Sequence, residues 1–284
     1  MEPDIDSKWG EWSPFHDPAL LANFQARPTD VLITTAPKAG TTWMQQILFQ
    51  LKTGGDTTFE DIDKVVPWLE FPRTDKSAHQ QLQNYELMEE PRIFKTHCTY
   101  QQTPGVNVAR IILSSRDPRD CCVSFYHHMM SLKDEALIKL KIERPGSFDD
   151  YFESWMSFSA WYRNVKSWWP HINNKNLLWL RYEDMVNNLE PCLDRILAFL
   201  NWTLDQSAKP MVLEYCSFAW MKQHSGKFFT RFDNGKSMFN SDGFIRKGQV
   251  GDHKNLLSPK QEQLILDRAK TELPEQCLIF LGLL

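Results

Sequence analysis

The stretch VLITTAPKAGTTW at residues 31–43 decides the fold of this chain. Its first five residues are β-prone, and a turn that contains Pro and Gly follows them at residues 36–40. Beyond the turn, apolar residues recur at the i, i+3, i+4, i+7 spacing of one helix face: Met44, Ile47, Leu48 and Leu51. The stretch therefore predicts a strand, a tight turn and an amphipathic helix in direct succession.

The same alternation continues along the chain. Three further strands are predicted at residues 92–96, 110–114 and 177–182, and three helices at about 119 onward, 189–200 and 259 onward. Apolar strands between amphipathic helices imply a parallel sheet that is covered on both faces. We therefore predict an α/β fold with a central parallel sheet flanked by helices. No repeat or long linker divides the chain, so we expect a single domain over residues 1–284.

The composition excludes some classes of protein. The 284 residues include 32 Lys and Arg against 36 Asp and Glu, so the net charge is −4 at pH 7. A weakly acidic chain does not coat a long polyanion such as nucleic acid, although it can hold a small anion locally. With 42% hydrophobic residues, the chain can bury a core without disulfides or metals.

The sequence also suggests a compartment. Residues 1–6 are acidic and lack an apolar run, so we expect neither a signal peptide nor a transit peptide. The sequence contains no run of 18 apolar residues, so we predict no membrane-spanning helix. The six cysteines form no C-x-x-C pair, which favours reduced thiols. Together these features predict a cytoplasmic protein.

The turn at residues 36–40 has the features of a phosphate-binding loop. Gly40 lets the backbone approach an anion, and the N–H groups at the start of a helix supply partial positive charge. Lys38 adds a full charge, and Thr41 and Thr42 add hydroxyl donors. The order differs from the P-loop motif G-x-x-x-x-G-K-[ST], because Lys38 precedes the glycine. On these residues alone, a solvated lysine in an ordinary turn remains an alternative.

The pattern P-K-x-G-T-T-W after a strand resembles the 5′-phosphosulfate loop of the cytosolic sulfotransferases, and the resemblance runs from Phe24 to about Lys254. These enzymes move a sulfuryl group from 3′-phosphoadenosine 5′-phosphosulfate (PAPS) to a hydroxyl or amine and release 3′,5′-bisphosphoadenosine (PAP). The family usually has Ser at the position of Ala39, so one hydroxyl donor is lost while the backbone N–H remains. The resemblance implies that the whole loop binds the cofactor: Lys38, Ala39, Gly40, Thr41, Thr42 and Trp43.

A second motif, R-[ND]-P-x-D-x-x-x-S, matches the chain from Arg116 to Ser124. Arg116 follows a predicted strand, and Ser124 lies about two turns into the next helix. An Arg fork and a hydroxyl can together hold a phosphate, but an Arg–Asp surface pair explains the spacing equally well. The resemblance assigns Arg116 and Ser124 to the 3′-phosphate of PAPS.

A third motif lies near the C-terminus. Two cations beside a glycine suit an anion-closing loop, although by itself this segment is more typical of a solvated turn. It resembles the family signature R-K-G-x-x-G-D-W-K, with His253 in place of the Trp, so the packing of this loop stays open. The resemblance assigns three residues to the 3′-phosphate: Arg246, Lys247 and Gly248.

The adenine site follows from the same resemblance. Trp43 closes the phosphate loop and can reach a purine face. The family pairs this Trp with a Phe, here Phe218. Cys216 replaces a hydroxyl that contacts the base, which weakens or removes that hydrogen bond. Tyr182, in a Y-E-D-M match, is placed near adenine by resemblance, although the residues alone suggest a core tyrosine.

The catalytic segment resembles R-x-x-K-T-H. His97 lies beyond a strand end, and Lys95 precedes it by two residues on the same face of the strand. The resemblance implies that His97 is the general base and that Lys38 and Lys95 stabilise the leaving group. The pair His127-His128 is a rival, but adjacent helix positions do not converge on one metal. With no H-E-x-x-H motif or Cys/His metal spacing, no metal is predicted.

The acceptor is predicted only as a small molecule. Residues 65–71 resemble the family segment near the acceptor, and Phe15, Trp68, Phe71 and residues 131–147 are candidates for the pocket wall. For each aromatic residue taken singly, core packing is the better interpretation. Glu70 could attract a cationic acceptor, but its pattern favours a surface or structural role.

Several alternatives remain on the sequence alone. The family dimerisation signature is not matched beyond Lys254, so the oligomeric state stays open. A P-loop small-molecule kinase would share the fold, but its phosphate motif is absent. A non-catalytic binder of PAP or PAPS would need no base, so Lys38 and His97 together disfavour it. A nucleic-acid-binding protein would need a basic stripe with interleaved aromatic residues, which the sequence lacks.

Overall fold

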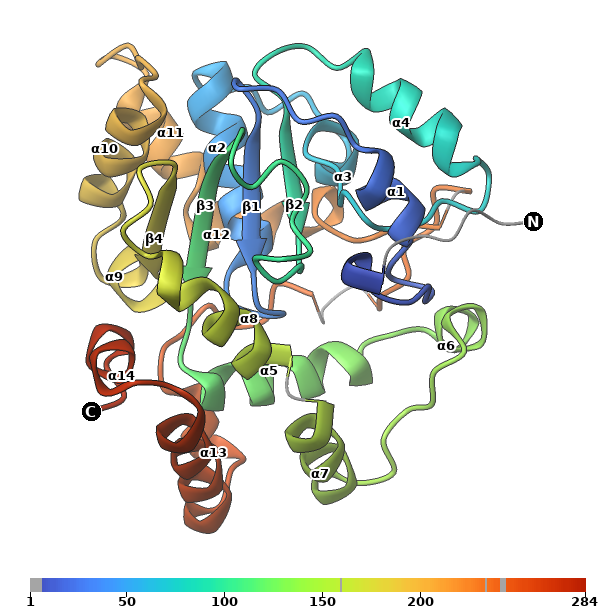
Figure 1. Cartoon of the computed structure of the whole chain (residues 1–284), viewed down its shortest axis with the longest axis vertical. Helices are drawn as coiled ribbons and strands as arrows, with labels where there is room; N and C mark the ends of the chain where they lie inside the picture. Colours follow the sequence, from blue (N-terminus) through green and yellow to red (C-terminus); the bar gives the residue numbers. More distant parts are fainter. Residues whose placement is uncertain (1–6, 159, 233, 241–243) are drawn as a thin grey trace.

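Four parallel strands form the centre of the molecule, in the order β2-β1-β3-β4 (Figure 1). The computed structural model describes residues 7–158, 160–232, 234–240 and 244–284. Residues 1–6, on which the expectation of no targeting peptide rests, lie outside the described residues. The strands are β1 (Val31–Thr35), β2 (Ile93–Thr96), β3 (Arg110–Ser115) and β4 (Leu177–Arg181). Each lies within one residue of its predicted bounds, so the predicted α/β fold is confirmed.

The strand register brings the functional turns together. β1 pairs with β2 and with β3, so that Val31 lies opposite both Ile93 and Arg110. β3 pairs with β4, with Ser115 opposite Arg181. Since all four strands run in the same direction, the segments that follow them begin at one edge of the sheet. Figure 1 shows α5 at this edge, directly after the lower end of β3.

One face of the sheet is covered by a helix from the N-terminal part of the chain and by three helices between residues 189 and 223. The predicted apolar stripe of α2 is buried in a single cluster with Val31 and Ile33 of β1. Each such aliphatic side chain contributes about 1.5–3 kcal/mol on burial, so this contact fixes the angle at which the chain leaves the phosphate turn. The helices on this face are α2 (Thr41–Thr53), α10 (Leu189–Leu200), α11 (Lys209–Tyr215) and α12 (Phe218–Gln223).

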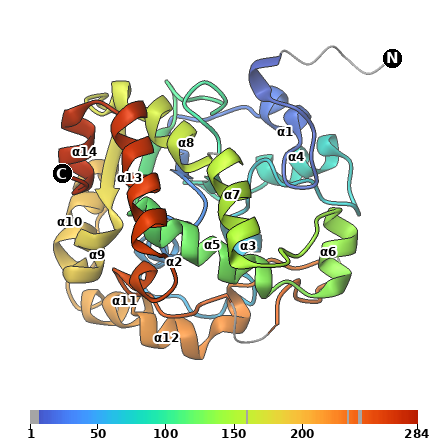
Figure 2. The same cartoon turned by 90° about the horizontal axis from the view of Figure 1, so that it is seen from below.

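Helices from both ends of the chain share the opposite face. Trp168, the largest fully buried side chain, lies in one cluster with Phe94 of β2 and Ile111 of β3. Figure 2 shows α8 on one side of the molecule and α11 and α12 on the other. The helices that contribute to this cluster include α1 (Pro18–Asn23), α5 (Pro118–Met130), α8 (Ala160–Trp168), α13 (Pro259–Glu272) and α14 (Glu275–Leu281), and α4 (Ala78–Glu86) and α7 (Phe148–Phe158) add Tyr85, Tyr151 and Phe152.

Shorter helical segments complete the described chain. A capping box is present at the start of α13, where the Ser258 hydroxyl accepts from the Gln261 N–H and the Gln261 side chain accepts from the Ser258 N–H. The remaining segments are α3 (Ile62–Val65), α6 (Asp134–Leu140), α9 (Tyr182–Asn187) and four 3₁₀ turns at Ser7–Trp9, Trp169–His171, Ser225–Lys227 and Asp252–Asn255.

The edge of the sheet opposite the functional turns is fastened by a buried ion pair. Arg92, just before β2, donates from Nε to Oδ1 of Asp30 at 2.8 Å and from Nη2 to Oδ2 at 2.7 Å. Both side chains are fully buried. The guanidinium also donates to the carbonyls of Gln25 and Tyr85, so it is saturated by partners from three segments.

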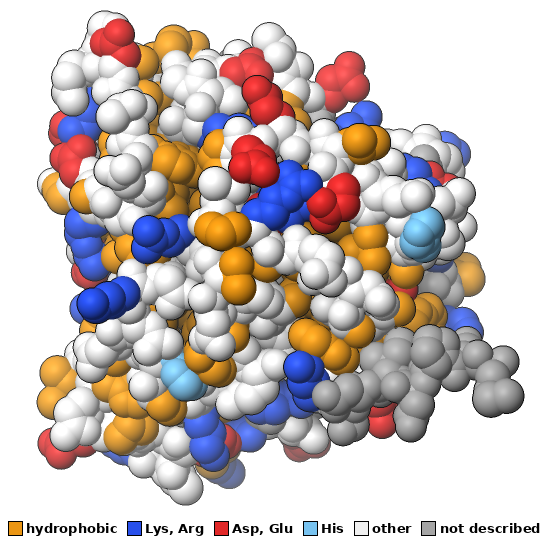
Figure 3. Space-filling model, turned by 45° about the horizontal axis from the view of Figure 1, so that its top comes forward, with side chains coloured by type: hydrophobic (Ala, Val, Ile, Leu, Met, Phe, Trp, Pro, Cys, Tyr) orange, Lys and Arg blue, Asp and Glu red, His pale blue; other side chains and the backbone are white. Residues whose placement is uncertain are grey.

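Charge is mixed on one face of the surface, and the described helices lack membrane-spanning character. On the face shown in Figure 3, acidic and basic side chains are interspersed. That face therefore does not offer the continuous basic stripe by which proteins track nucleic acid. Among the described residues, none of the helices has the length and hydropathy that a membrane crossing requires.

We expect the substitution Arg92→Leu to lower the free energy of unfolding by about 3–5 kcal/mol, because it leaves the Asp30 carboxylate buried without its counter-charge. Urea unfolding followed by tryptophan fluorescence measures the change. The exposed pair Lys64–Glu60, at 4.0 Å, provides the matched control, and Lys64→Gln should change stability by less than about 0.5 kcal/mol. Equal effects of the two substitutions would contradict the structural role of the buried pair.

Candidate functional site

One cavity of about 1280 Å³ opens at the carboxyl edge of the sheet. Its walls come from the turn after β1, the end of β2, α5, α9, α12 and the loop at residues 244–249. Of the residues that the sequence assigns to the site, all except Ala39 line this cavity. They are Lys38, Gly40, Thr41, Thr42, Trp43, Lys95, His97, Arg116, Ser124, Tyr182, Cys216, Phe218, Arg246, Lys247 and Gly248.

The turn after β1 is shaped by two residues in the left-handed region, Lys38 with φ 68° and Gly40 with φ 94°. At Gly40 only glycine fits, because a Cβ would lie 2.9 Å from the Cδ2 atom of Tyr182. Helix α2 then begins at Thr41, and no described side chain caps it. Its first N–H groups therefore remain available to an anion in the cavity.

Ala39 is turned away from the cavity. It is fully buried, and its N–H donates to the Ala36 carbonyl at 3.2 Å. Its own carbonyl accepts from the Ser114 hydroxyl of β3 at 2.7 Å. The sequence suggested that this N–H could face the anion, but the geometry uses it to close the turn. Ala39 thus shapes the loop and does not line the site.

Lys38 enters the cavity beside His128 of α5. Its Nζ atom lies 3.2 Å from His128 Nδ1. Burial lowers the pKa of Lys38 to about 7, and the positive charge of Arg116 acts in the same direction. Burial also lowers the pKa of His128 well below its usual value, so the imidazole is neutral at pH 7. A bound anion would supply the counter-charge that Lys38 lacks.

His97 bridges the ends of two neighbouring strands. Its Nδ1 atom lies 2.8 Å from the Thr35 carbonyl at the end of β1. A carbonyl only accepts, so Nδ1 carries the proton and Nε2 holds the lone pair. Burial lowers the pKa of His97, against the opposing charge of Glu70, and the ring is neutral at pH 7. The ring therefore presents a basic nitrogen, and its orientation is fixed by the backbone.

Lys95 lines the same cavity but already has a counter-charge. Its Nζ atom donates to Oδ1 of Asp63 at 2.9 Å, and both side chains are buried. The ammonium also lies 5.0 Å from the ring centre of Trp68. Its charge is thus largely balanced before any ligand arrives, in contrast to that of Lys38.

The second anion motif is built around a buried carboxylate. Arg116 precedes α5, donates to the Gln249 carbonyl at 2.9 Å and lies 3.5 Å from Asp120. Asp120 in turn accepts from the N–H groups of Gly251 and His253 at 2.8 and 3.0 Å and from His253 Nδ1 at 2.8 Å. The packing question raised by His253 is thereby answered, because this histidine fastens the loop to α5.

The third motif carries its own counter-charge. Arg246 and Lys247 both pair with Asp252, and the Lys247 Nζ–Asp252 Oδ1 distance is 2.6 Å. Gly248 follows with φ 62°, and a Cβ there would lie 2.4 Å from Cδ2 of Phe218. The fold thus brings this loop against both α12 and the start of α5, and the second and third motifs meet in one place.

The expected adenine residues form a wall of rings. Trp43 and Tyr182 meet edge to face with ring centres 5.4 Å apart. The Trp43 indole N–H donates to the Cys216 carbonyl at 2.7 Å, while the Cys216 side chain is fully buried. Phe218 is 39% exposed and lies across the cavity mouth beside Gly248. The carbonyl of residue 216 thus holds the Trp43 ring in place, which is a different contact from the hydrogen bond to the base that a hydroxyl at this position would make.

The opposite end of the cavity is apolar. Trp68 packs edge to face on His97, with ring centres 5.1 Å apart, and stacks near Phe15 and Phe71. Further lining residues at this end are Met129 of α5, Leu132 after it, Leu140 at the end of α6, and Phe239 and Phe244 nearer the C-terminus. The predicted segments 65–71 and 131–147 therefore both contribute to the cavity wall.

The contacts of three polar residues at the site are not predicted by the sequence. His128 had been set aside as a member of a helical pair, yet it contacts Lys38. Asp63 pairs with Lys95, and buried Glu70 accepts from the His97 N–H at 2.8 Å. The only sequence signal for Glu70 was its resemblance to the acceptor segment, and Asp63 had none. All three act through contacts between segments distant in sequence, which a local pattern does not record.

Comparison with known proteins places this geometry in a family. The sulfotransferase domain family matches residues 28–274. The chain belongs to the sulfotransferase family. It is 32% identical over 260 residues to mouse sulfotransferase 1 family member D1, covering 88% of this chain and 85% of that protein. It is 28% identical over 257 residues to human sulfotransferase 1C2, covering 86% and 82%.

Solved structures confirm the sulfotransferase fold. Mouse sulfotransferase SULT7A1 complexed with PAP superposes with a TM-score of 0.73 at 23% identity, covering 95% of this chain and 94% of that one. Retinol dehydratase, solved with androsterone and PAP, superposes with a TM-score of 0.71 at 19% identity, covering 89% and 83%. The predicted family and reaction class, PAPS-dependent sulfuryl transfer, are confirmed. The kinase and the non-catalytic binder are not favoured.

Because the pKa of Lys38 is lowered to about 7, we expect PAP binding to weaken as the pH rises. Below pH 7 the amine is protonated and attracts the anion, whereas above pH 7 binding must also take up a proton. The dissociation constant should then rise up to about tenfold per pH unit between pH 7 and 9.

Calorimetric titration of PAP at a series of pH values measures this dependence. Lys38→Arg provides the control, because a guanidinium stays charged throughout this range. Its profile should be flatter than that of the wild type. Parallel profiles for the two proteins would show that another group causes the dependence.

Proposed function

We propose that this sulfotransferase binds PAPS across the cavity and transfers its sulfuryl group to a small apolar acceptor, with His97 as general base. The observation that carries the proposal is the neutral His97, whose Nε2 lone pair belongs to the same cavity as the Lys38 turn. A proton acceptor and an anion cradle in one cavity are the two parts that this transfer needs.

The proposed reaction is an in-line displacement at sulfur. The acceptor oxygen or nitrogen forms a bond to sulfur while His97 Nε2 takes its proton. The bond from sulfur to the bridging oxygen breaks, and the electron pair stays on the 5′-phosphate of PAP. Lys38 and the first N–H groups of α2 stabilise this growing negative charge. We propose that Lys95 stabilises this charge less than Lys38 does, because Asp63 balances the charge of Lys95.

The 3′-phosphate is proposed to lie where the second and third motifs meet. Arg116 and Ser124 would bind it from the α5 side, and Gly248 would offer its N–H from the loop. Arg246 and Lys247 are paired with Asp252, so the phosphate would compete with this carboxylate for them. The adenine ring would then lie against Trp43 and Phe218, with Tyr182 behind the phosphate turn.

The acceptor is proposed to be an apolar small molecule that carries a hydroxyl or an amine. The support is the aromatic end of the cavity, where Trp68 and Phe71 stand beside His97. We also propose that the protein works in the cytoplasm, since the six cysteines are all unpaired and buried, as suits a reducing compartment. A single domain over the whole chain is proposed because α1 and α14 share one hydrophobic cluster.

We expect His97→Ala to lower kcat by roughly 10²–10⁴-fold, because it removes the proton acceptor without touching the phosphate turn. Turnover with labelled PAPS against a panel of phenols, alcohols and amines measures the effect, and PAP affinity should stay within about twofold. His127→Ala is the control for the loss of an imidazole elsewhere in the molecule. His127 lies on α5 and is not among the described residues that line the cavity. Wild-type turnover by His97→Ala would refute the assignment of the base.

We expect Gly248→Ala to weaken PAP binding at least about tenfold, because its Cβ would meet the Phe218 ring at 2.4 Å and displace the adenine wall. Gly235→Ala is the matched control: it has a similar positive φ of 79°, but a Cβ there meets nothing within 4 Å. Both variants bear the backbone strain, so only the first should lose affinity in calorimetry. Equal affinities would exclude the steric explanation.

A further inference from the structure

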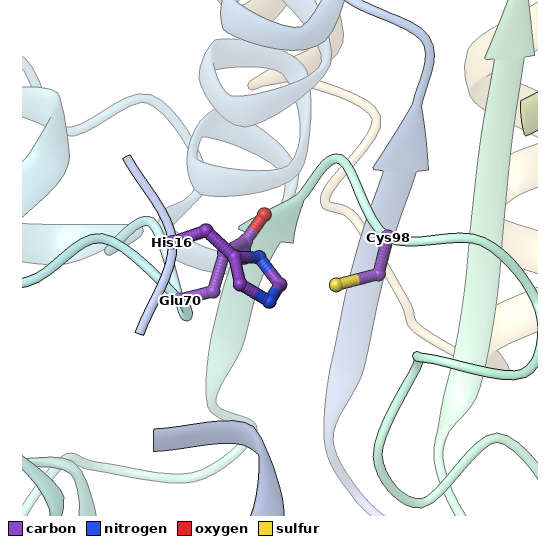
Figure 4. Close-up of side chains that lie close together, drawn as sticks. All are labelled: His16, Glu70 and Cys98. Atoms are coloured by element: carbon purple, nitrogen blue, oxygen red, sulfur yellow. The ribbon is translucent and has the colours of Figure 1, made fainter. Parts of the chain in front are cut away.

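Three side chains that the proposed transfer does not use converge on the wall of the cavity: His16, Glu70 and Cys98 (Figure 4). Their ligand atoms lie within 4.8 Å of one another. They come from the segment before α1, the segment between α3 and α4, and the first residues after β2. Imidazole nitrogen, carboxylate oxygen and thiol sulfur are all metal ligands, and together they form a mixed set.

In two of the three residues, Glu70 and His16, the structure engages one polar atom of the side chain and leaves the other available. The Glu70 Oε1 atom accepts from the His97 N–H at 2.8 Å, whereas Oε2 is buried and has no hydrogen-bond partner among the described residues. The His16 Nε2 atom lies 2.6 Å from the Trp9 carbonyl. Since a carbonyl only accepts, Nε2 carries the proton and Nδ1 keeps its lone pair.

The remaining oxygen of Glu70 is the observation that points to a ligand. Only 2% of Glu70 is exposed, and a buried carboxylate oxygen without a donor costs free energy. The nearest partners offered by the cluster are a lone pair on His16 and the sulfur of Cys98, which is itself 2% exposed. A cation at the centre would satisfy all three groups at once.

We propose that His16, Glu70 and Cys98 form a binding site for a divalent metal ion of the Zn²⁺ class. Zn²⁺ accepts nitrogen, oxygen and sulfur ligands at about 2.0–2.3 Å, which sets ligand–ligand distances of roughly 3.3–3.8 Å. The cluster must therefore contract by about 1 Å. Coordination needs the thiolate, so binding releases the proton of Cys98.

The three residues would occupy three of the four positions of a tetrahedral metal ion, and the fourth position would face the cavity. All three residues line the cavity, so the remaining ligand is water or a group that enters the cavity. The outer contacts are those that hold metal ligands in proteins: the Trp9 carbonyl orients His16, and the His97 N–H orients Glu70. The site stands beside His97, but no step of the proposed transfer uses it.

A cobalt titration tests the site directly. Untagged full-length protein, freed of metal with a chelator, is titrated with Co²⁺ and followed by absorption. We expect one Co²⁺ per chain, a near-ultraviolet sulfur-to-cobalt charge-transfer band and visible bands typical of tetrahedral cobalt. Added Zn²⁺ should displace Co²⁺ and remove the bands. This readout does not depend on sulfuryl transfer, so it is independent of the proposed function.

Substitutions assign the bands to residues. Cys98→Ala should remove the charge-transfer band, and His16→Gln and Glu70→Gln should each weaken Co²⁺ binding at least about tenfold while the band persists at saturation. Cys192→Ala is the control for a buried cysteine, because Cys192 lies in the cluster on the other face of the sheet. It should leave both the band and the affinity unchanged.

Two results would overturn the proposal. One is a wild-type protein without a charge-transfer band at saturating Co²⁺. The other is a band that survives in Cys98→Ala, which would assign the sulfur to another cysteine. If Cys98→Ala fails to fold by circular dichroism, Glu70→Gln still decides, since it keeps the shape of the side chain and removes its charge. Unchanged Co²⁺ affinity in that variant would refute the site.

Discussion

The position of the loop that carries Arg246 depends on the buried carboxylate of Asp120. This carboxylate accepts three hydrogen bonds from Gly251 and His253, although these residues are more than a hundred positions away, and it lies 3.5 Å from Arg116. Burial alone would raise the pKa of Asp120, but the hydrogen bond from His253 and the charge of Arg116 outweigh it and lower the pKa. The ionised carboxylate therefore holds the loop of Arg246 against α5.

The charges of the cavity explain why a weakly acidic protein can receive a nucleotide with several negative charges. Lys95 is paired with Asp63, and both Arg246 and Lys247 are paired with Asp252. For Lys38, by contrast, the described residues offer a neutral imidazole and no carboxylate within ion-pair distance. Its positive charge is thus the most poorly compensated of the four, and its ionisation is the one that a bound anion changes most.

The sequence was sufficient for the elements whose cause is local. A five-residue β-prone run, a turn with Gly40 and a helical stripe specify β1 and α2, and similar short β-prone runs specify the other strands. The contacts of Glu70 and His128 were out of reach, because they arise from the parallel register and from the angle at which α5 crosses the cavity. The proposed metal ligands show the limit most clearly: His16, Glu70 and Cys98 have no characteristic spacing, and only the fold brings them together.

The departures from the family pattern fall at residues whose other atoms hold the wall of the cavity together. Ala39 lacks a hydroxyl, but its main chain closes the turn and receives the Ser114 hydroxyl. Cys216 has a buried thiol, yet its carbonyl binds the Trp43 indole. His253 replaces a large ring with a smaller one whose N–H reaches Asp120. Such positions tolerate exchange because main-chain atoms and one buried carboxylate set the geometry of the site. Gly40 and Gly248 do not tolerate it, since aromatic rings occupy the space that a Cβ would need.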